Sequence, residues 1–489
     1  MWMKKLAQHF EKMRSIYPGD RLIVLFDIDG TILDMRHMVL SVLSSYDQNH
    51  DSSHFDGLEL SDIDVHENHV ESLLSRMEIP TGKAKSILKW VTANLWTPEN
   101  LLEAHLPFSG VMEVMRWLQI QPDTDVGLNT GRPEYMRAET LNSLNHLGKE
   151  YKVRFTDELL HMSPNEWEDS MEQPKVEGVR YYQDLGYRVV AFIDNEPDNL
   201  LAVSEAEGTS EIMLLHADTI FETTRKHLPT SSVSGNHYDL AQLIDEKSLP
   251  KNIQLVWHGL NDRANLLQFL ASDVQWGEVD VRLDPNSDNL ILRHDSFDRT
   301  PLQDHEELLT LDEVLSPLNE LGRSINLDIK EGGPHIGRVI GLIGEYGFDD
   351  SRVWFNANID SLGENDFRRF AKEFPASVVQ CPIDFVAPAI AAFPDDAKRT
   401  LDELKSWGIN RFSLKWSTFN RRQVIDQLGD WGFEINIYNV PDLESFLKAV
   451  LLLPTSVTSD FNFPQWHYFG HGSGENGEYA PLDQVQASA

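Results

Sequence analysis

The stretch from Phe26 to Asp34, Phe-Asp-Ile-Asp-Gly-Thr-Ile-Leu-Asp, constrains the fold of the first half of the chain more than any other. An apolar run that starts at Leu22 predicts a buried strand, which stops at two acids one residue apart. Because side chains alternate along a strand, Asp27 and Asp29 begin on the same face, where like charges repel unless a cation lies between them. A hard dication with oxygen ligands, most simply Mg²⁺, fits this arrangement. The pattern indicates a carboxylate that attacks phosphorus while a metal neutralises the phosphate.

A solvated acidic turn at the end of a strand is the alternative interpretation. Gly30, Thr31 and the apolar residues after them weaken it, because a simple acidic turn needs none of them. The nine residues resemble the first motif of the haloacid dehalogenase-like (HAD) phosphatases. The resemblance implies a Mg²⁺-dependent phosphatase with Asp27 as nucleophile and Asp29 as general acid/base.

Three further segments follow in the order that this resemblance implies. The short strand Val126-Gly-Leu-Asn-Thr130 ends in a hydroxyl and a turn, which can hold a phosphate oxygen. Lys175 precedes an expected helix and strand, and lies 194 − 175 = 19 positions before Asp194. A lysine to balance the phospho-enzyme and an acid to complete the metal shell are what the chemistry still lacks. We therefore expect Thr130 and Lys175 to be catalytic, and Asp194 and Asp198 to join Asp27 and Asp29 around Mg²⁺.

About seventy residues, roughly 37–106, show helical rather than strand periodicity. An insertion at this point resembles the helical cap of many HAD phosphatases, which closes over the site and selects substrates. We assign residues 1–222 to the HAD-like domain. The polar stretch within 223–250 predicts an interdomain linker.

Composition narrows the class of protein. A chain of 489 residues is too long for one ordinary core, and its 41% apolar and 25% charged residues describe a folded chain. The formal charge of −36 argues against a general nucleic-acid binder. The single cysteine, Cys381, permits no intrachain disulfide, and its apolar surroundings favour buried packing. No stretch approaches the length of a transmembrane helix, and a cytoplasmic location follows by default.

In the second half, strand-like runs alternate with helical segments. Eight such runs predict a (β/α)₈ barrel over 251–460, with its functional side chains at the carboxyl ends of the strands. The expected strands are 253–257, 276–281, 325–329, 353–358, 378–382, 412–416, 434–438 and 457–460. The whole chain is thus expected to be of the α/β class: a Rossmann-like domain with a helical cap, then a TIM barrel.

Polar residues lie where these strands end. Glu278, Asp280 and Asp328 can hold a divalent cation, Ca²⁺ or Mg²⁺. His258 and His294 can take and give protons across a phosphodiester. A purely structural histidine is the alternative for either position, and the recurrence of polar residues on successive strands weighs against it.

These segments resemble glycerophosphodiester phosphodiesterases, through Trp257-His258-Gly259, the Glu278 and Asp280 strand, Leu292-Arg-His-Asp, and Asn326-Leu-Asp-Ile-Lys330. The resemblance implies catalytic histidines at 258 and 294, metal ligands at Glu278, Asp280 and Asp328, and an active-site lysine at 330. Two positions depart from it: Gly259 replaces the arginine usual after the first histidine, and Asp328 stands where Glu is common. Both put ordinary substrate handling in doubt.

A second resemblance competes for the barrel. Residues 353–358 and 412–416 look like the menorin family, which shares this phospholipase-C-like barrel. We expect a small phosphorylated substrate, with the barrel cleaving a diester and the first domain removing the remaining monoester. The alternative is a phosphatase joined to a non-catalytic barrel that binds a ligand or partner. Residues 461–489 are expected to be a flexible tail, and the oligomeric state is left open.

Overall fold

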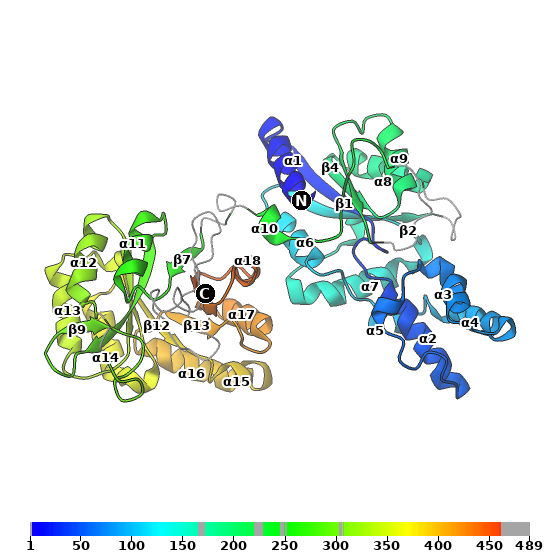
Figure 1. Ribbon diagram of the computed structural model, residues 1–489. Coiled ribbons are helices and arrows are strands. Elements are labelled where there is room, and N and C mark those ends of the chain that lie inside the picture. Colours follow the sequence, from blue (N-terminus) through cyan, green and yellow to red (C-terminus); the bar gives the residue numbers. More distant parts are fainter. Residues whose placement is uncertain are drawn as a thin grey trace. The chain divides into compact units, whose positions relative to one another are not determined.

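The computed structural model describes residues 2–164, 172–219, 228–244, 249, 252–302, 306 and 308–460. The chain divides into two compact units, Met1–Leu243 and Ile244–Ala489. Figure 1 shows a sheet with helices on it in the first unit and a barrel in the second. The predicted fold class, α/β with a TIM barrel as its second part, is confirmed. The expected tail at 461–489 lies outside the described residues.

The first unit is built on a six-stranded parallel sheet with the order β3-β2-β1-β4-β5-β6. Leu22 to Phe26 are all buried, because β1 lies between β2 and β4 with helices on both sides. In a parallel sheet the carboxyl ends of neighbouring strands meet at one edge, so the segments after β1, β2 and β4 come together there. The strands are β1 (Arg21–Phe26), β2 (Thr124–Pro133), β3 (Leu160–Ser163), β4 (Tyr187–Asp194), β5 (Met213–Ala217) and β6 (Val233–Gly235).

The predicted cap segment is helical in the structure. It runs from α2 to α5 and includes two short 3₁₀ turns, Leu60–Asp62 and Glu67–His69. The amphipathic N-terminus forms α1 (Trp2–Ile16), whose apolar face is buried. The other helices of the unit are α2 (Arg36–His50), α3 (Val70–Arg76), α4 (Thr81–Asn94), α5 (Pro98–Glu103), α6 (Val111–Gln119), α7 (Arg137–Gly148), α8 (Glu172–Asp184), α9 (Pro197–Glu205) and α10 (Leu240–Leu243).

The expected linker, 223–250, contains ordered structure of the first unit. Val233–Gly235 pairs with β5 as the last strand of the sheet, and the hydroxyl of Tyr238 donates to the carbonyl of Thr31 at 2.8 Å. The indole of Trp2 donates to the carbonyl of His237 and its ring lies 5.0 Å from that of Tyr238. The boundary between the units therefore falls after Leu243. A polar serine-rich sequence does not reveal a three-residue edge strand, because so short an element carries almost no periodicity.

The second unit is a closed parallel barrel in which each of the eight expected strands is present. Closure comes from the pairing of β8 with β10, and a short antiparallel strand, β9, is added to β8. The strands are β7 (Gln254–Trp257), β8 (Trp276–Leu283), β9 (Leu290–Leu292), β10 (Ser324–Ile329), β11 (Val353–Asn356), β12 (Val378–Pro382), β13 (Arg411–Lys415), β14 (Glu434–Val440) and β15 (Ser456–Ser459).

Helices connect these strands and surround the barrel. The helices are α11 (Arg263–Ala271), α12 (Leu311–Glu320), α13 (Ile336–Glu345), α14 (Ile359–Glu373), α15 (Ala387–Ala392), α16 (Pro394–Ser406), α17 (Arg421–Asp430) and α18 (Leu443–Leu451). Alternation along β10 and β8 turns every second residue inward, and the register pairs Asp328 with Asp280. Two of the expected metal ligands are thereby neighbours on adjacent strands.

No helix among the described residues is long and apolar enough to cross a membrane. Cys381 is buried and unpaired, as its sequence context indicates.

Candidate functional sites

At the carboxyl edge of the first unit's sheet, Asp27 and Asp194 converge on one lysine. The ammonium of Lys175 lies 2.5 Å from Asp27 Oδ1 and 2.9 Å from Asp194 Oδ2, and all three side chains are buried. Asp27 follows β1, Asp194 ends β4, and Lys175 lies in the first turn of α8. The structure thus brings together three of the residues that the sequence assigned to this site.

Burial raises the pKa of Asp27 to about 8, while Lys175 acts to lower it and Asp194 to raise it. The pKa of Lys175 is raised, since its two carboxylate partners outweigh the effect of burial. One cation therefore serves two acids, and the pair of carboxylates carries an uncompensated negative charge when both are ionised. That is the electrostatic setting in which a divalent cation is stabilising.

The carboxylate of Asp29 is hydrogen-bonded to Arg132, a residue for which the sequence predicted no role at this site. Arg132, fully buried at the end of β2, donates to Asp29 from Nε at 2.8 Å and from Nη2 at 2.6 Å. Burial alone would raise the pKa of Asp29, but Arg132 outweighs it and the pKa is lowered. Arg132 lies two residues after Thr130, at the end of the strand that carries the second HAD-like motif, and only the pairing of β1 with β2 identifies it as the partner of Asp29.

Thr130 and Asp198 were also expected at this site. Thr130 is buried, and its hydroxyl accepts from the backbone amide of Arg132 at 3.2 Å. Asp198 is half-buried at the second position of α9. The neighbouring Asn199, which was not expected, donates from its side chain to Asp194 Oδ1 at 3.1 Å.

Asn195 is a second residue that sequence reasoning missed. In the orientation that satisfies its neighbours, its side-chain nitrogen donates to Asp27 Oδ2 and to the carbonyl of Asp29, both at 3.1 Å. Asn195 directly follows Asp194 and fixes the second oxygen of the expected nucleophile. Nothing in the spacing of the motifs distinguishes it from an ordinary turn residue.

The cap contributes His66 and Glu67 to a small cavity of about 30 Å³ over this edge, which Gly30, Asn195 and Thr219 also line. His66 Nε2 lies 3.7 Å from Glu196 Oε1 of the core. Burial and the charge of Asp29 raise the pKa of Glu67 to about 8. The cap therefore lies against the site, which fits the role predicted for it.

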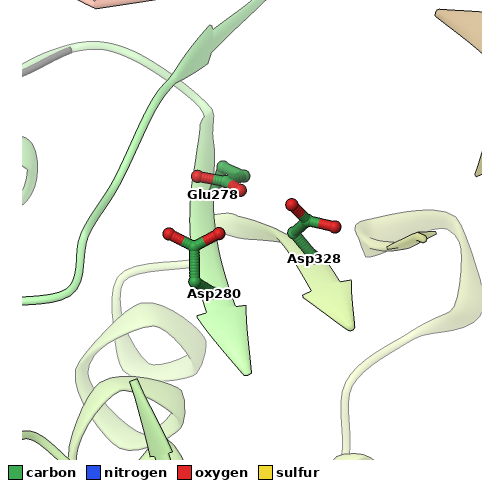
Figure 2. Close-up of side chains that lie close together, drawn as sticks. All are labelled: Glu278, Asp280 and Asp328. Carbon is green, nitrogen blue, oxygen red and sulfur yellow. The ribbon is translucent and has the colours of Figure 1, made fainter. Parts of the chain in front are cut away.

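In the barrel, Glu278, Asp280 and Asp328 form the one group of three potential metal ligands found among the described residues. One carboxylate oxygen from each lies within 4.8 Å of the others. Figure 2 shows the three carboxylates projecting toward a common point from β8 and β10. Glu278 and Asp280 are buried and Asp328 is half-buried. Oxygen donors of this number and charge are the set that Ca²⁺ or Mg²⁺ takes.

Lys330 lies against the same acids. Its ammonium is 2.6 Å from Asp280 Oδ1 and 2.5 Å from Asp328 Oδ2. Burial raises the pKa of Glu278 to about 8, with Asp280 adding to the effect. Burial would also raise the pKa of Asp280, but Lys330, His294 and His258 together outweigh it and the pKa is lowered. Three acids with one lysine leave negative charge for a dication to offset.

His258 follows β7 and is held between two acids. Its Nδ1 bonds to Asp460 Oδ1, and its Nε2 lies 3.7 Å from Glu278 Oε2. Burial disfavours the imidazolium, but Glu278 and then Asp460 outweigh it and raise the pKa of His258 to about 10. Asp460 ends the expected eighth strand, and its pairing with His258 follows from the parallel pairing of β15 with β7.

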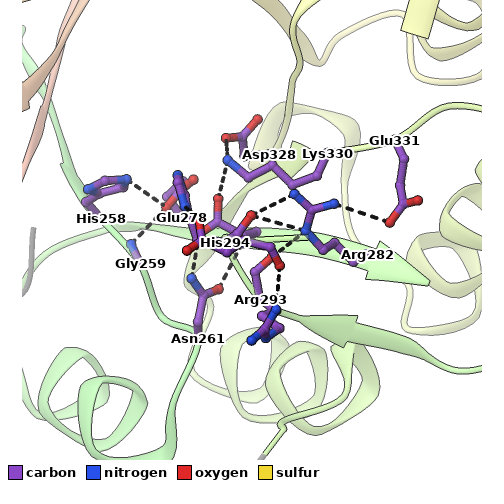
Figure 3. A network of polar contacts seen from close by, with 12 residues as sticks. His258, Gly259, Asn261, Glu278, Arg282, Arg293, His294, Asp328, Lys330 and Glu331 are labelled. Atoms are coloured by element: carbon purple, nitrogen blue, oxygen red, sulfur yellow. Dashed lines mark hydrogen bonds and ion pairs between the residues drawn. The ribbon is translucent and has the colours of Figure 1, made fainter. Parts of the chain in front are cut away.

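His294 lies close to Glu278 and Asp328, two of the expected metal ligands, in Figure 3. Its Nδ1 bonds to Asp295 Oδ1 at 2.9 Å, and its carbonyl accepts from Arg282 Nη2 at 2.7 Å. His258 and His294 line one cavity, so the structure brings the two expected proton-transfer residues to the same site.

Gly259 departs from the phosphodiesterase pattern, and the structure shows what glycine does there. Its φ is +72°, a left-handed value that a side chain rarely adopts, and its amide donates to Glu278 Oε2 at 2.8 Å. Asn261 makes two hydrogen bonds with Asp280. Its side-chain nitrogen donates to Asp280 Oδ2 at 2.5 Å, and its side-chain oxygen accepts from the backbone amide of Asp280 at 2.9 Å. The segment after β7 therefore orients two of the expected metal ligands through backbone and amide contacts.

The barrel cavity has a volume of about 230 Å³. Its lining is charged on the side of β7, β8 and β10, and mostly uncharged and polar on the side of β11 to β15. The uncharged polar lining residues are Asn326, Asn356, Asn358, Gln380, Ser413, Asn436, Tyr438, Asn439 and Thr458. Both segments that resemble the menorin family contribute to this wall, through Asn356, Asn358, Ser413 and Lys415.

Comparisons with known proteins give structural neighbours only. No protein-family model matches the chain, and no curated protein matches it either. A glycerophosphodiester phosphodiesterase from Agrobacterium tumefaciens matches with 16% identity and a TM-score of 0.31, over 42% of this chain and 96% of its own. A glycerophosphoryl diester phosphodiesterase from Parabacteroides distasonis matches with 14% identity and a TM-score of 0.31, over 43% and 84%.

A HAD-superfamily hydrolase from Geobacter sulfurreducens matches with 12% identity and a TM-score of 0.30, over 45% of this chain and 94% of its own. The matches thus include both expected kinds of protein, each spanning less than half of this chain. At these identities and scores we take no activity from them, and function is argued below from the geometry of the two sites.

Proposed function

We propose that the first unit hydrolyses phosphomonoesters with Asp27 as the nucleophile and Mg²⁺ as the cofactor. The observation that carries the proposal is the position of Asp27, buried between Lys175, Asn195 and Asp194 at the carboxyl edge of the sheet. The contact with Asn195 fixes one oxygen of Asp27, and Lys175 offsets negative charge beside it. Asp27 and Asp194 would hold the ion, which supplies charge neutralisation at the phosphate.

In this proposal Asp27 attacks phosphorus to form an aspartyl phosphate, and the bond to the ester oxygen breaks. Asp29 gives a proton to the departing alcohol and then takes one from the water that hydrolyses the aspartyl phosphate. Lys175 offsets the negative charge of the phosphorylated Asp27. Arg132 holds Asp29 in a fixed orientation through two hydrogen bonds. The cap, through His66 and Glu67, excludes water and contacts the alcohol part of the substrate.

We propose that the barrel cleaves a phosphodiester with Ca²⁺ or Mg²⁺ held by Glu278, Asp280 and Asp328. His258 and His294 line the same cavity as these acids, which supports their use as a proton-transfer pair. The carboxylate of Asp460 bonds His258 Nδ1 and stabilises its protonated form, so we assign His258 the proton that the leaving oxygen receives. His294 takes the proton of the attacking water as its oxygen bonds to phosphorus, and the bond between phosphorus and the leaving oxygen breaks as His258 protonates that oxygen. The monoester product would be the substrate of the first unit.

A non-catalytic barrel that binds a ligand or partner is the second candidate. It is favoured by Lys330, which already pairs with two of the acids, and by Gly259, which replaces an arginine that would hold phosphate. In this case the first unit alone would be an enzyme.

An assay with phosphodiesters and Ca²⁺ or Mg²⁺ distinguishes the two candidate functions. It compares the full wild-type chain with its Asp27→Asn and His294→Ala variants. The wild-type chain should release inorganic phosphate, Asp27→Asn should stop at the monoester, and His294→Ala should leave the diester intact. Diester that stays intact with every chain, while monoesters are hydrolysed, would select the non-catalytic barrel.

A further inference from the structure

Three phenylalanines on the barrel are exposed, although few aromatic side chains are exposed in the part of the chain that the structure describes. Phe419 is 86% exposed, Phe393 66% and Phe385 62%. Phe385 and Phe393 bound the nine residues Phe-Val-Ala-Pro-Ala-Ile-Ala-Ala-Phe, which contain no charge in a chain where a quarter of the residues are charged. Exposed apolar side chains that gather in one place usually mark a binding surface.

We name this surface the apolar rim. It consists of the exposed residues of α15 and its flanks together with the loop after β13: Phe385, Pro388, Ala391, Ala392, Phe393 and Phe419.

Asp384 fixes the position of the rim next to the barrel cavity. Its Oδ1 accepts from the amide of Lys415 and the hydroxyl of Thr418, both at 2.9 Å, and its Oδ2 accepts from the hydroxyl of Tyr438 at 2.7 Å. Lys415 and Tyr438 line the cavity, as does Pro382 at the end of β12. Phe385 directly follows Asp384, and Phe419 directly follows Thr418. The two phenylalanines therefore stand at the edge of the polar cavity.

A polar cavity that adjoins an apolar surface fits a ligand with the same two parts. We propose that the apolar rim binds the alkyl or acyl chain of an amphiphilic phosphodiester whose phosphate lies in the barrel cavity. This inference rests on the proposed phosphodiester site and adds the class of substrate: a single-chain, lipid-like diester rather than a fully water-soluble one. The free energy comes from removing the chain and the phenyl rings from water.

Two other occupants fit less well. A stable protein interface takes about 20–30 residues from each side, far more than the rim provides. A membrane surface rich in anionic lipid would face the exposed acids Asp395 and Asp396, two and three residues after Phe393, and a chain with a formal charge of −36. A single alkyl chain needs only the few side chains that are present.

The test uses ethyl, butyl, hexyl and octyl phosphocholine, which differ only in the length of the chain on the phosphodiester. Calorimetry with Ca²⁺ gives the Kd of each for the full-length chain carrying His294→Ala, so that turnover does not interfere. We expect Kd to tighten by about two- to fourfold for each added methylene. Phe385→Ser with Phe419→Ser should remove this dependence and leave the Kd of the ethyl compound unchanged. The substitutions are at exposed positions, so folding should be preserved.

Leu267→Ser is the matched control, because this leucine is 61% exposed on α11 and does not line the cavity. It should keep the full dependence on chain length. Equal Kd values along the series, or a dependence that survives both phenylalanine substitutions, would overturn the inference. So would binding to phosphatidylcholine vesicles through the two phenylalanines with no dependence on chain length, which would assign the rim to a membrane.

Hydrolysis of ethyl phosphocholine by the wild-type chain, measured alongside, separates this inference from the proposed function. Hydrolysis together with equal Kd values along the series would show that the barrel cleaves phosphodiesters and that the apolar rim does not bind the alkyl chain. A chain-length dependence without hydrolysis means that the barrel binds such diesters and does not cleave them.

Discussion

Asp29 and Arg132, 103 residues apart in sequence, are joined by two hydrogen bonds at 2.6 Å and 2.8 Å in the interior of the first unit. The contact connects the expected general acid to the strand that carries the second motif. It also sets a chemical condition, because a guanidinium paired with both carboxylate oxygens favours the ionised form. Asp29 is thus well prepared to take a proton from water and less well prepared to give one to a leaving group.

This arrangement predicts an altered pH profile in Arg132→Lys. Lysine keeps the charge but loses the two-point contact, so the pKa of Asp29, which is lowered in the wild type, should rise. Where ionised Asp29 limits the rate, the acid limb of kcat/KM should move to higher pH. The profile with a phosphomonoester checks this, and an unmoved acid limb in a folded variant would show that Asp29 does not determine it.

The nucleophile is tested by Asp27→Asn. A neutral amide neither attacks phosphorus nor balances a metal, so phosphomonoester hydrolysis should be abolished while the fold remains. Asp29→Asn should cost on the order of a hundredfold or more, because proton transfer is lost. Asp184→Asn, at an exposed position on α8, is the matched control and should retain full activity. Near-normal turnover by folded Asp27→Asn would remove this residue from the mechanism.

The proposed metal site of the barrel predicts cation binding that depends on pH. The pKa of Glu278 is about 8, above its usual 4.5, so the carboxyl holds a proton at neutral pH when no metal is bound. Because a ligand must lose that proton, Ca²⁺ affinity should increase as pH rises from about 6 to 9. Calorimetry on the full chain measures it, and Glu278→Gln should bind much more weakly at every pH. Wild-type and Glu278→Gln chains that bind Ca²⁺ equally would exclude this carboxylate as a ligand.

The histidine pair predicts a bell-shaped dependence of diester cleavage on pH. His258→Ala and His294→Ala should each slow diester cleavage and flatten one limb, leaving phosphomonoester hydrolysis untouched. Asp460 raises the pKa of His258, so Asp460→Asn should lower that pKa and shift the basic limb to lower pH. Rate profiles for the two substrates, measured on the same protein samples, provide the check. Diester cleavage that survives both alanine substitutions would exclude these histidines as the acid and base.

Lys330 predicts a stability that depends on metal. In Lys330→Met the acids Asp280 and Asp328 lose a close cation, and breaking such a buried pair costs roughly 3–5 kcal/mol. The loss should appear as a lower Tm of the barrel without metal, and saturating Ca²⁺ should recover most of it. A Tm that falls equally with and without Ca²⁺ would place Lys330 outside the cation site.

The strands and the motif acids were predictable from sequence because their signals are local. An apolar run before Asp27, or polar residues at the end of each barrel strand, needs only a few neighbouring positions to be recognised. The pairings of Arg132 with Asp29 and of Asp460 with His258 were not predictable, because each depends on which strands lie side by side. Asn195 and Asn199 act through hydrogen-bond geometry that no spacing encodes. Val233–Gly235 was expected in a linker because three residues are too few to show a strand period.

That edge strand has a consequence for how the protein is made. Tyr238 and Trp2 lie ring against ring, and Tyr238 also bonds the loop that follows Asp29, so the first unit needs residues near both of its ends to be complete. During synthesis, the sheet therefore cannot gain its last strand until the chain has been made almost as far as the start of the second unit. A nascent chain that ended near residue 222 would lack the last strand of the sheet and the Tyr238 contact that supports the loop after Asp29. Val233 to Tyr238 are therefore the last part of the first unit to be added, and the unit can complete its fold only after they have been made.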